Sequence, residues 1–484
     1  MFHIVLINPP RRHVVELDLP GFVDLGEISS FPPIGLMYLA QALRQESPLN
    51  HVTILDCVAD GLDAEQTAQK VKELAPDLVG ITSFTFTFYD VLETAKCLKA
   101  AGVRAPLAIG GPHMYLFGPE TMSHQIFDIG VVGDGEEVFA QACKALREGT
   151  PIPDLPGLLH RVDGKLTGSG VAQLQGLDDV QIPAIDLIDP TKYYSTLGKS
   201  MAVGTICSSR GCPFRCTFCQ VPHTPYRTRA VENVVDEMER YVAMGILDFF
   251  FFDDLFNITK QRVVDFSKEI LRRGLKVSWM FRGRVDQIDE EMMRMAVKAG
   301  CHTVSVGVED ATDKGLKAIR KNITIAQAKQ AVRDIRKSGA RSSTNWILGF
   351  PHHSTQADMD QLLRTAIAVD ADYAQFSILQ CMPGSELYDQ AVQEGGLDPD
   401  AWRNYVLSPV PLFSPPIWER HFSKEQLCAH YSHMYKRYYM RPRVFIRELL
   451  ATASFAELFR KVKTFCRFFL PWGHKGHNDK RAKA

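Results

Sequence analysis

The sequence predicts an α/β protein with two successive parallel sheets, the first doubly wound and the second a partial barrel. Apolar runs of strand length alternate with helical patterns over residues 1–150, and six further strand and helix units follow over 201–395. Six units are too few to close an eight-stranded barrel and suit a partial one. Both architectures bind ligands at the carboxyl ends of their strands, so we expect the chemistry there.

Five strands are expected in the first series, at residues 3–7, 52–55, 78–82, 106–109 and 126–132. Helical patterns separate them at 34–44, 64–74 and 91–101. Each strand runs into a loop rich in Pro, Gly, Asp, Ser or Thr, which indicates a ligand along one sheet edge. Proline and glycine then break every pattern over 151–200, which we interpret as a connector with a small hairpin.

Six strands are expected in the second series, at 202–207, 247–252, 277–281, 303–308, 343–348 and 373–379. The helices between them are expected at 231–244, 262–273, 290–299, 325–338 and 356–369. Residues 396–484 form a helical C-terminal region, in which a helix over 423–450, rich in tyrosine, is expected to roof the barrel cavity, or else to be an ordinary packed helix. Residues 440–484 carry eleven Lys and Arg against three Asp and Glu. This basic, aromatic segment indicates a packed helix with a solvated tail, or else peripheral contact with a membrane surface.

The composition is that of a globular protein, because 45% of the 484 residues are hydrophobic and 23% are charged. Lys and Arg number 55 and Asp and Glu 56, so no net charge favours nucleic acid as a partner. Eleven cysteines, an odd number, without a signal segment at Met1, favour the reducing cytoplasm over a disulfide framework. No apolar run reaches the roughly 18 residues of a membrane span.

The strongest local signal is a loop with three cysteines, Cys212, Cys216 and Cys219, directly after the first strand of the second series. Thiolates select zinc, copper or iron–sulfur centres. Structural zinc normally takes four ligands, whereas three thiolates on a four-iron cluster leave one iron open. The alternative recruits Cys207 as a fourth ligand and makes a zinc-stabilised binding protein without catalysis, although its spacing is not that of a zinc ribbon.

This loop, with aromatic Phe218 before its last cysteine at the head of a partial barrel, resembles the radical S-adenosylmethionine (SAM) superfamily. The resemblance implies that the three cysteines hold a 4Fe-4S cluster and that SAM chelates the open iron. Residues at later strand ends fit SAM contacts by the same resemblance. We expect Asp253 and Asp254 to receive the amino group, Arg284 the carboxylate and Glu309 the ribose, with Phe218 beside the cofactor.

The first series resembles the cobalamin-binding subclass of this superfamily, through Asn8-Pro9-Pro10, Pro32-Pro33-Ile34-Gly35, Gly110-Gly111-Pro112-His113 and Gly133-Asp134-Gly135-Glu136. The resemblance spans residues 1–400 and implies cobalamin contacts at Asn8, Val58, Ser83, Thr85, Gly110, Gly111, His113, Gly135 and Glu136. Other cobalamin proteins carry a cobalt-ligating His in the Asp-x-His-x-x-Gly loop, and here that position is Val58. We therefore expect a lower cobalt face that is open or carries water. A domain that binds no cofactor is the alternative, and ligation by His113 is a weaker one.

The resemblance implies a cobalamin-dependent radical SAM enzyme that methylates an unactivated carbon of a small-molecule, lipid or tetrapyrrole-like substrate. In that scheme a 5′-deoxyadenosyl radical activates the substrate, and methylcobalamin supplies the methyl group. The alternative with the same cofactors is a radical cyclase or rearrangement enzyme, as in the anaerobic magnesium-protoporphyrin ester cyclases. Either reaction implies a reducing electron donor such as flavodoxin or ferredoxin. The residues leave the substrate and the oligomeric state open.

Overall fold

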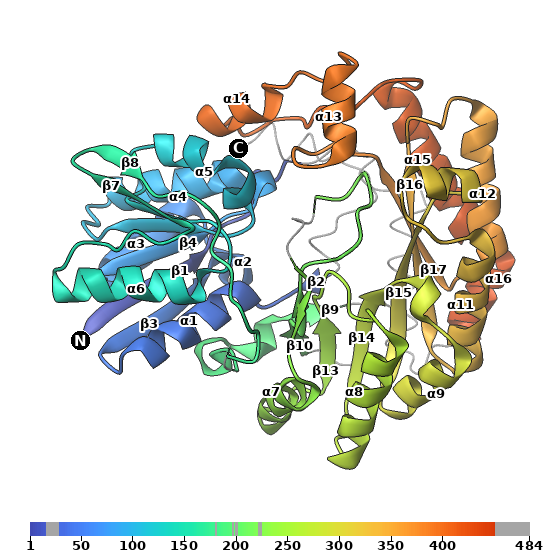
Figure 1. Cartoon of the computed structure of the whole chain (residues 1–484), viewed down its shortest axis with the longest axis horizontal. Helices are drawn as coiled ribbons and strands as arrows, with labels where there is room; N and C mark the ends of the chain where they lie inside the picture. Colours follow the sequence, from blue (N-terminus) through green and yellow to red (C-terminus); the bar gives the residue numbers. More distant parts are fainter. Residues whose placement is uncertain (16–28, 180–181, 196–197, 199–201, 221–224, 451–484) are drawn as a thin grey trace.

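Two α/β units lie side by side in the structure, a computed structural model, and C-terminal helices connect them (Figure 1). The structure describes residues 1–15, 29–179, 182–195, 198, 202–220 and 225–450. The basic segment over 440–484 therefore lies mostly outside the described residues. In the part of the chain described, no helix is both long and apolar enough to span a membrane.

The first unit contains a seven-stranded sheet in the order β3-β1-β4-β5-β6-β7-β8. Its parallel strands confirm the predicted α/β alternation, and they are β1 (Phe2–Asn8), β3 (Asn50–Asp56), β4 (Leu78–Thr82), β5 (Leu107–Gly110) and β6 (Ile129–Val131). Helices cover both faces, and they are α1 (Ile34–Glu46), α2 (Cys57–Asp60), α3 (Ala64–Leu74), α4 (Phe88–Ala100), α5 (His113–Ser123) and α6 (Gly135–Glu148). The strand order reverses between β1 and β4, and a doubly wound sheet binds its ligand at such a point.

The hairpin expected in the connector is present as β7 (Leu158–Val162) and β8 (Lys165–Thr167), which pair antiparallel. It is not an isolated hairpin, because β7 also pairs with β6 and so extends the first sheet past residue 150. Two short strands, β2 (Ser29–Ser30) and β9 (Tyr194–Ser195), pair with each other and fasten the connector to the first unit.

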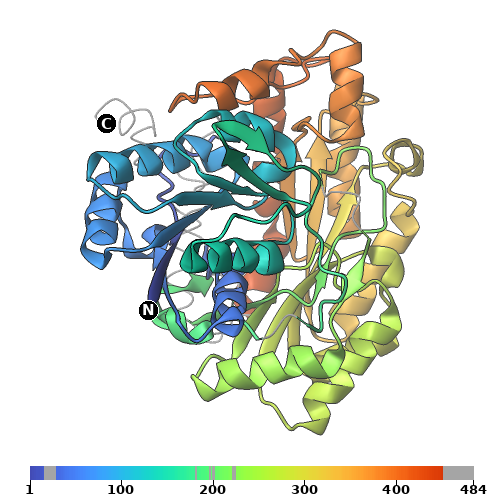
Figure 2. The ribbon, with the colours of Figure 1, turned by 60° about the vertical axis from the view of Figure 1, so that its left-hand side comes forward.

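The second unit is a six-stranded sheet in sequence order, as expected for a partial barrel. Its strands are β10 (Val203–Ile206), β13 (Asp248–Phe251), β14 (Ser278–Gly283), β15 (Cys301–Glu309), β16 (Arg341–Leu348) and β17 (Tyr373–Ile378). The outer helices are α7 (Val231–Ala243), α8 (Lys260–Arg272), α9 (Glu290–Lys298), α10 (Asp313–Ala318), α11 (Ile325–Lys337) and α12 (Gln356–Val369). The inner face of this sheet lies toward the first unit (Figure 2).

Alternation along the barrel strands divides outward from inward side chains. Phe251 and Trp279 pack outward with Phe266 of α8, edge to face, at ring distances of 5.1–5.9 Å. Phe250 and Met280, their neighbours in sequence, point inward and belong to a separate apolar cluster. The inner face therefore has its own lining, which is distinct from the core under the helices.

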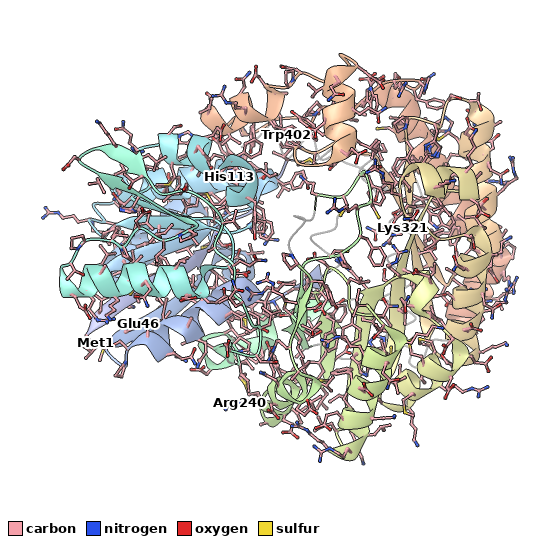
Figure 3. The ribbon with its side chains drawn as sticks, viewed as in Figure 1. Met1, Glu46, His113, Arg240, Lys321 and Trp402 are labelled. Carbon is pink, nitrogen blue, oxygen red and sulfur yellow. The ribbon has the colours of Figure 1, made fainter. Side chains whose placement is uncertain are left out.

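Helix α13 (Glu386–Gln393) follows β17, and the described part of the C-terminal region contains α14 (Ala401–Leu407), α15 (Lys424–Tyr439) and α16 (Pro442–Leu450). The helix expected over 423–450 is thus two helices that break at Pro442. Helix α14 packs on the first unit, where buried Trp402 meets Phe86 edge to face (Figure 3).

The expectation that the tyrosines of 423–450 roof the cavity is wrong. Helix α15 lies along β17, the last strand of the barrel sheet, where Tyr435 and Tyr439 accept hydrogen bonds from the backbone N–H groups of Phe376 and Ala374. Their hydroxyls also donate to the carbonyls of the same two residues. The tyrosines therefore satisfy the backbone groups of an edge strand, which would otherwise be exposed.

Candidate functional site

The cysteine loop is held at both ends by a two-stranded ladder and in the middle by backbone hydrogen bonds. Strands β11 (Ser209–Arg210) and β12 (Arg227–Thr228) pair antiparallel and frame the loop. Thr217 N donates to Ile319 O at 3.2 Å, and Leu387 N donates to Thr217 O at 3.0 Å. The loop therefore contacts segments that follow β15 and β17, at the carboxyl end of the barrel.

The thiols of this loop are half-buried and suit metal binding. Burial raises the pKa of Cys212 and Cys216, and the nearby positive charges of Arg284 and Lys321 oppose that rise. Since a metal is bound by the thiolate, cationic neighbours reduce the cost of deprotonation. Cys216 Sγ also lies 3.9 Å from the carbonyl of Arg320. This donor set fits a cluster that carries each thiolate on a separate iron.

A mononuclear zinc site on the same cysteines does not fit. Four ligands at about 2.3 Å from zinc would place neighbouring sulfurs about 3.8 Å apart. Within the described ranges, the only trio of His, Cys, Asp or Glu with all ligand atoms within 4.8 Å is Asp310, His352 and His353. Cys207, the suggested fourth ligand, instead donates to Ser209 O at 3.2 Å. The zinc-stabilised binding protein is therefore not supported.

Asp254 and Glu309 lie at the carboxyl ends of two barrel strands, and Phe218 lies within the cysteine loop. Asp254 is exposed after β13, and its Oδ2 accepts from Gly211 N at the start of the cysteine loop at 3.2 Å. Glu309 ends β15 at a positive φ of 77°, with Oε1 3.1 Å from Lys321 Nζ. Phe218 is half-buried and packs edge to face on Phe350.

Asp253 and Arg284 have other partners than SAM in the structure. Asp253 is buried and accepts hydrogen bonds from Ser208 N, Ser208 Oγ and Ser209 Oγ at 2.6–2.7 Å. Arg284 donates to Asp286 at 2.9 and 3.1 Å and to the Lys321 carbonyl at 2.9 Å. Asp253 therefore braces the loop after β10, and Arg284 braces the segment after β15. The expected pairing of these two side chains with SAM is not supported.

In the first unit, the candidate ligand site lies at the carboxyl ends of β1 and β4, where the strand order of the sheet reverses. Asn8 Nδ2 donates to Asp56 Oδ1 at 2.8 Å, and the same oxygen accepts from the backbone N–H groups of Val58 and Ala59. Asn8 and Asp56 thus fix the loop in which Val58 stands in place of histidine. Val58 is 37% exposed and Phe84 42% exposed, an unusual degree for apolar residues beside a buried sheet.

One detail of this edge fits cobalamin. Among the described residues, nothing hydrogen-bonds to the buried Oγ of Ser83, which follows β4. A buried hydroxyl without a partner is costly and indicates an absent polar ligand. Gly111, at φ 97°, packs closely on this loop, because a Cβ at that position would lie 2.7 Å from the Ser83 carbonyl oxygen. Gly110 ends β5 beside it. Glycine at position 111 therefore lets the loops after β4 and β5 approach each other closely.

His113 is a packing residue and offers no free ring nitrogen, so the expectation that it contacts cobalamin is not supported. Its Nδ1 and Nε2 lie 3.0 and 2.9 Å from the hydroxyls of Thr85 and Thr121. The ring is fully buried and stacks on Phe88 at 4.2 Å. Burial lowers the pKa of His113 to about 3, which keeps the imidazole neutral. Thr85 is likewise engaged within the first unit.

Glu136 also differs from expectation, because it joins the two units. Its carboxylate pairs with Arg210 of β11, and Asp134 pairs with Arg210 and with Arg227 of β12, each at 2.7 Å. Gly135 begins α6 between these two carboxylates. The start of α6 therefore forms ion pairs with both strands, β11 and β12, of the ladder that frames the cysteine loop. Sequence patterns gave no sign of this contact, because the partners are about 75–95 residues apart.

A second buried contact between the units is formed by Tyr38, Arg229 and Glu237. Glu237 and Arg229 form an ion pair whose side chains are 0% and 2% exposed. Tyr38 of α1 donates to Glu237 Oε2 at 3.2 Å and accepts from Arg229 at 2.9 Å. Nearby, Ala59 of the Val58 loop packs in one apolar cluster with Phe250 and Met280 of the barrel. The cobalamin edge thus adjoins the inner face of the barrel.

A set of hydrogen bonds that the sequence analysis also missed connects two loops of the barrel. His352 Nε2 and His353 Nε2 lie 2.7 and 2.9 Å from Asp310 Oδ2, directly after Glu309. Asp310 Oδ1 accepts from Thr312 N at 2.9 Å. These are the distances of charge-assisted hydrogen bonds, and they fasten the segment after β15 to the segment after β16. The adjacent histidines were the only signal in the sequence.

Comparison with known proteins agrees with the geometry. The model of the radical SAM superfamily matches residues 206–366, and that of the B12 binding domain matches residues 29–142. The uncharacterized methyltransferase PH0819 of Pyrococcus horikoshii is 33% identical over 93% of this chain and 95% of its own. An anaerobic magnesium-protoporphyrin IX monomethyl ester cyclase of Cereibacter sphaeroides is 27% identical over 86% of this chain and 68% of its own.

The fold also has solved counterparts. The radical SAM methyltransferase TsrM from Kitasatospora setae, with cobalamin and a 4Fe-4S cluster bound, superposes with a TM-score of 0.66 and 22% identity, over 82% of this chain and 76% of that one. OxsB, a cobalamin-dependent radical SAM enzyme, gives a TM-score of 0.63 over 91% and 61% of the two chains. With its B12 binding domain, its cysteine loop and its full-length relative, this chain is an enzyme of the cobalamin-dependent radical SAM family.

Proposed function

We propose that the enzyme transfers a methyl group to an unactivated carbon of a small-molecule substrate. One observation carries this proposal: the Val58 loop and the inner face of the barrel share a single apolar cluster, through Ala59, Phe250 and Met280. A methyl carrier on the first unit and a radical generator in the barrel must act on the same substrate atom, and adjoining edges allow this. A cyclase with the same cofactors has no need of a transferable methyl group.

Each cofactor has a proposed set of holding residues. Cys212, Cys216 and Cys219 hold the cluster. Asp254 takes the ammonium group of SAM, Glu309 takes the ribose and Phe218 lies beside the cofactor. When bound, the cluster and SAM supply a carbon-centred radical, and cobalamin carries the methyl group.

On the first unit, Ser83 donates a hydrogen bond to the cobalamin, and Gly110 and Gly111 lie beside it at the same edge of the sheet. Val58 and Phe84 offer an apolar surface to a flat ring. Val58 has no donor atom, so this position contributes no metal ligand. The residues around the site thereby bind and orient the groups and exclude water.

The reaction needs an external reductant, for which we propose a small acidic electron carrier such as a flavodoxin or ferredoxin. Arg215 is exposed within the cysteine loop itself. A cationic side chain at that position favours encounter with an acidic partner close to the cluster.

Transfer of isotope from SAM tests the methylation. The reconstituted holoenzyme is incubated anaerobically with a reductant, with SAM deuterated in its methyl group, and with a metabolite extract from cells that lack the gene. We expect deuterated methyl in one extract component with the wild type and in none with Cys216→Ala. Formation of 5′-deoxyadenosine without label transfer would reject methylation and favour the cyclase, whose relatives match much of this chain.

A further inference from the structure

The barrel encloses a cavity of about 140 Å³ beside strands β13 and β14. Its lining is largely apolar and includes Phe31, Phe250, Phe252 and Met280, together with one charged side chain, Arg282. Phe31 from the first unit meets Phe250 and Phe252 at ring distances of 5.1 and 4.9 Å, so this wall is closed by both units. A pocket with apolar walls and few polar groups is typical of a small-molecule site.

Arg282 is the unusual member of this lining. Its guanidinium lies 5.8 Å from the centre of the Phe252 ring, and among the described residues no side chain or carbonyl accepts a hydrogen bond from it. Arg284, two residues along the same segment, is by contrast paired with Asp286. Arg282 is exposed, so its guanidinium is accessible to a ligand, and no carboxylate offsets its charge. An accessible guanidinium beside an aromatic ring and without an anionic partner can bind an anion.

The opposite wall of the barrel is polar. Trp346 and Leu348 of β16 are fully buried under the helices, so Asn345, which directly precedes Trp346, belongs to the opposite, inner face. Asn345 Oδ1 is buried and has no hydrogen-bond partner among the described residues. Asn345 pairs in register with Gln375 of β17, which is exposed on the same face. A ligand in the barrel therefore meets aromatic rings on one side and amide groups on the other.

We propose that the barrel binds a substrate with an apolar body, which packs on Phe250, Phe252 and Met280, and a carboxylate or phosphate-like group, which pairs with Arg282. The planar fork of a guanidinium donates two parallel hydrogen bonds to such an oxyanion. Asn345 and Gln375 bond to polar groups on the far side of the substrate. The inference rests on the proposed function only in taking the barrel as the substrate site.

A matched pair of ligands tests the charge requirement apart from catalysis. Naphthoate and naphthylmethanol share a ring system and differ in the anionic group, and both are titrated calorimetrically into the reconstituted holoenzyme. We expect wild type to prefer naphthoate, and Arg282→Met to weaken naphthoate binding roughly tenfold or more with naphthylmethanol little changed. Arg282→Lys keeps the positive charge but lacks the planar guanidinium, so its affinity for naphthoate should lie between those of wild type and Arg282→Met.

The control is Arg240→Met, at an exposed position of α7 that is not among the cavity-lining residues (Figure 3). It should leave both affinities unchanged. If Arg282→Met fails to fold, Arg282→Lys carries the comparison. An unchanged ratio of the two affinities in the folded variant, or a wild type that does not prefer naphthoate, overturns the proposal. Because no turnover is measured, loss of label transfer in the isotope experiment leaves this result intact, and the two failures are distinguishable.

Discussion

The guanidinium of Arg284 lies 3.8 Å from the centre of the Phe214 ring, which stands between the first two cysteines of the cysteine loop. Arg284 is itself fixed by Asp286 and by the Lys321 carbonyl. A desolvated cation and aromatic ring attract each other by about 2 kcal/mol. The contact therefore connects the end of β14 to the loop that binds the cluster, and it supplies the positive charge that favours thiolates there.

Removal of that contact should loosen the cluster. We expect Arg284→Met to lose iron to a chelator roughly tenfold faster than wild type, since the loop loses a restraint of about 2 kcal/mol. Iron and sulfide per chain, followed anaerobically over time, measure the effect. Arg294→Met, which removes an exposed ion pair with Glu290, is the control. Equal iron retention in Arg284→Met and Arg294→Met would contradict the role of Arg284.

Replacement of Cys207 and replacement of Cys216 should have different effects on the cluster. Cys216→Ala should bind far less than the about four irons of a full cluster and form no 5′-deoxyadenosine. Cys207→Ala should keep both properties, because its Sγ is engaged with Ser209 O. The measurements are iron content, visible absorption and deoxyadenosine yield under one reductant. A full cluster in Cys216→Ala, or its loss in Cys207→Ala, would refute the assignment.

The buried pair of Arg229 and Glu237 should matter to stability more than any surface pair on α7. We expect Glu237→Ala to lower the free energy of unfolding by about 3–5 kcal/mol, because Arg229 remains buried without an anion. Glu239→Ala on the same helix removes a pair whose glutamate is 44% exposed and should cost at most about 1 kcal/mol. Urea denaturation of both variants beside wild type checks the difference, and equal midpoints would contradict it.

Histidine 113 should make the protein sensitive to mild acid. Its folded pKa of about 3 lies below the unfolded value of 6.5, so the unfolded chain binds the proton more readily. The stability from neutral His113 is fully present above pH 6.5 and is lost as pH falls, by about 1.4 kcal/mol per pH unit.

Replacement of the His113 imidazole tests whether this residue causes the acid sensitivity. Between pH 7.5 and 5.5, thermal denaturation of His113→Gln should vary less with pH than that of wild type. His421→Gln, on the surface, should follow wild type. A wild-type profile that is unchanged by His113→Gln would place the acid sensitivity elsewhere.

Position 58 should decide whether the protein supplies a metal ligand to cobalamin. Val58→His restores the residue type found in Asp-x-His-x-x-Gly loops, at a side chain that is already 37% exposed. We expect its imidazole to ligate added cobalamin and to shift the visible absorption relative to wild type, while Val58→Ala leaves the spectrum unchanged. Identical spectra for Val58→His and Val58→Ala would show that this loop does not face the cobalt.

The sequence predicted the strands well because their physical cause is local. Buried parallel strands need uninterrupted apolar runs, and each of the eleven expected runs overlaps a strand of the structure. The cysteine spacing was equally local. The tyrosines of α15 were misread because their hydroxyls pair with an edge strand about 60 residues away, a cause that no helical pattern contains.

The sequence predicted which polar residues lie at strand ends better than it predicted what their side chains contact. Asp253 and Asp254 are adjacent and chemically alike, yet only the first is buried among serine donors. Which carboxylate faces a ligand depends on the direction of the side chain after the strand, and adjacent residues point to opposite sides. The protein partners of Glu136 and His113 could not be predicted for a related reason, because they come from other segments of the chain.

The ion pairs between the start of α6 and the strands β11 and β12 affect how far the two units can move relative to each other. Asp134 contacts both arginines of that ladder, and Glu136 contacts one of them. These ion pairs restrain the first unit against the base of the cysteine loop. We therefore expect the distance between the sheet edge and the thiols to change little when the first unit moves.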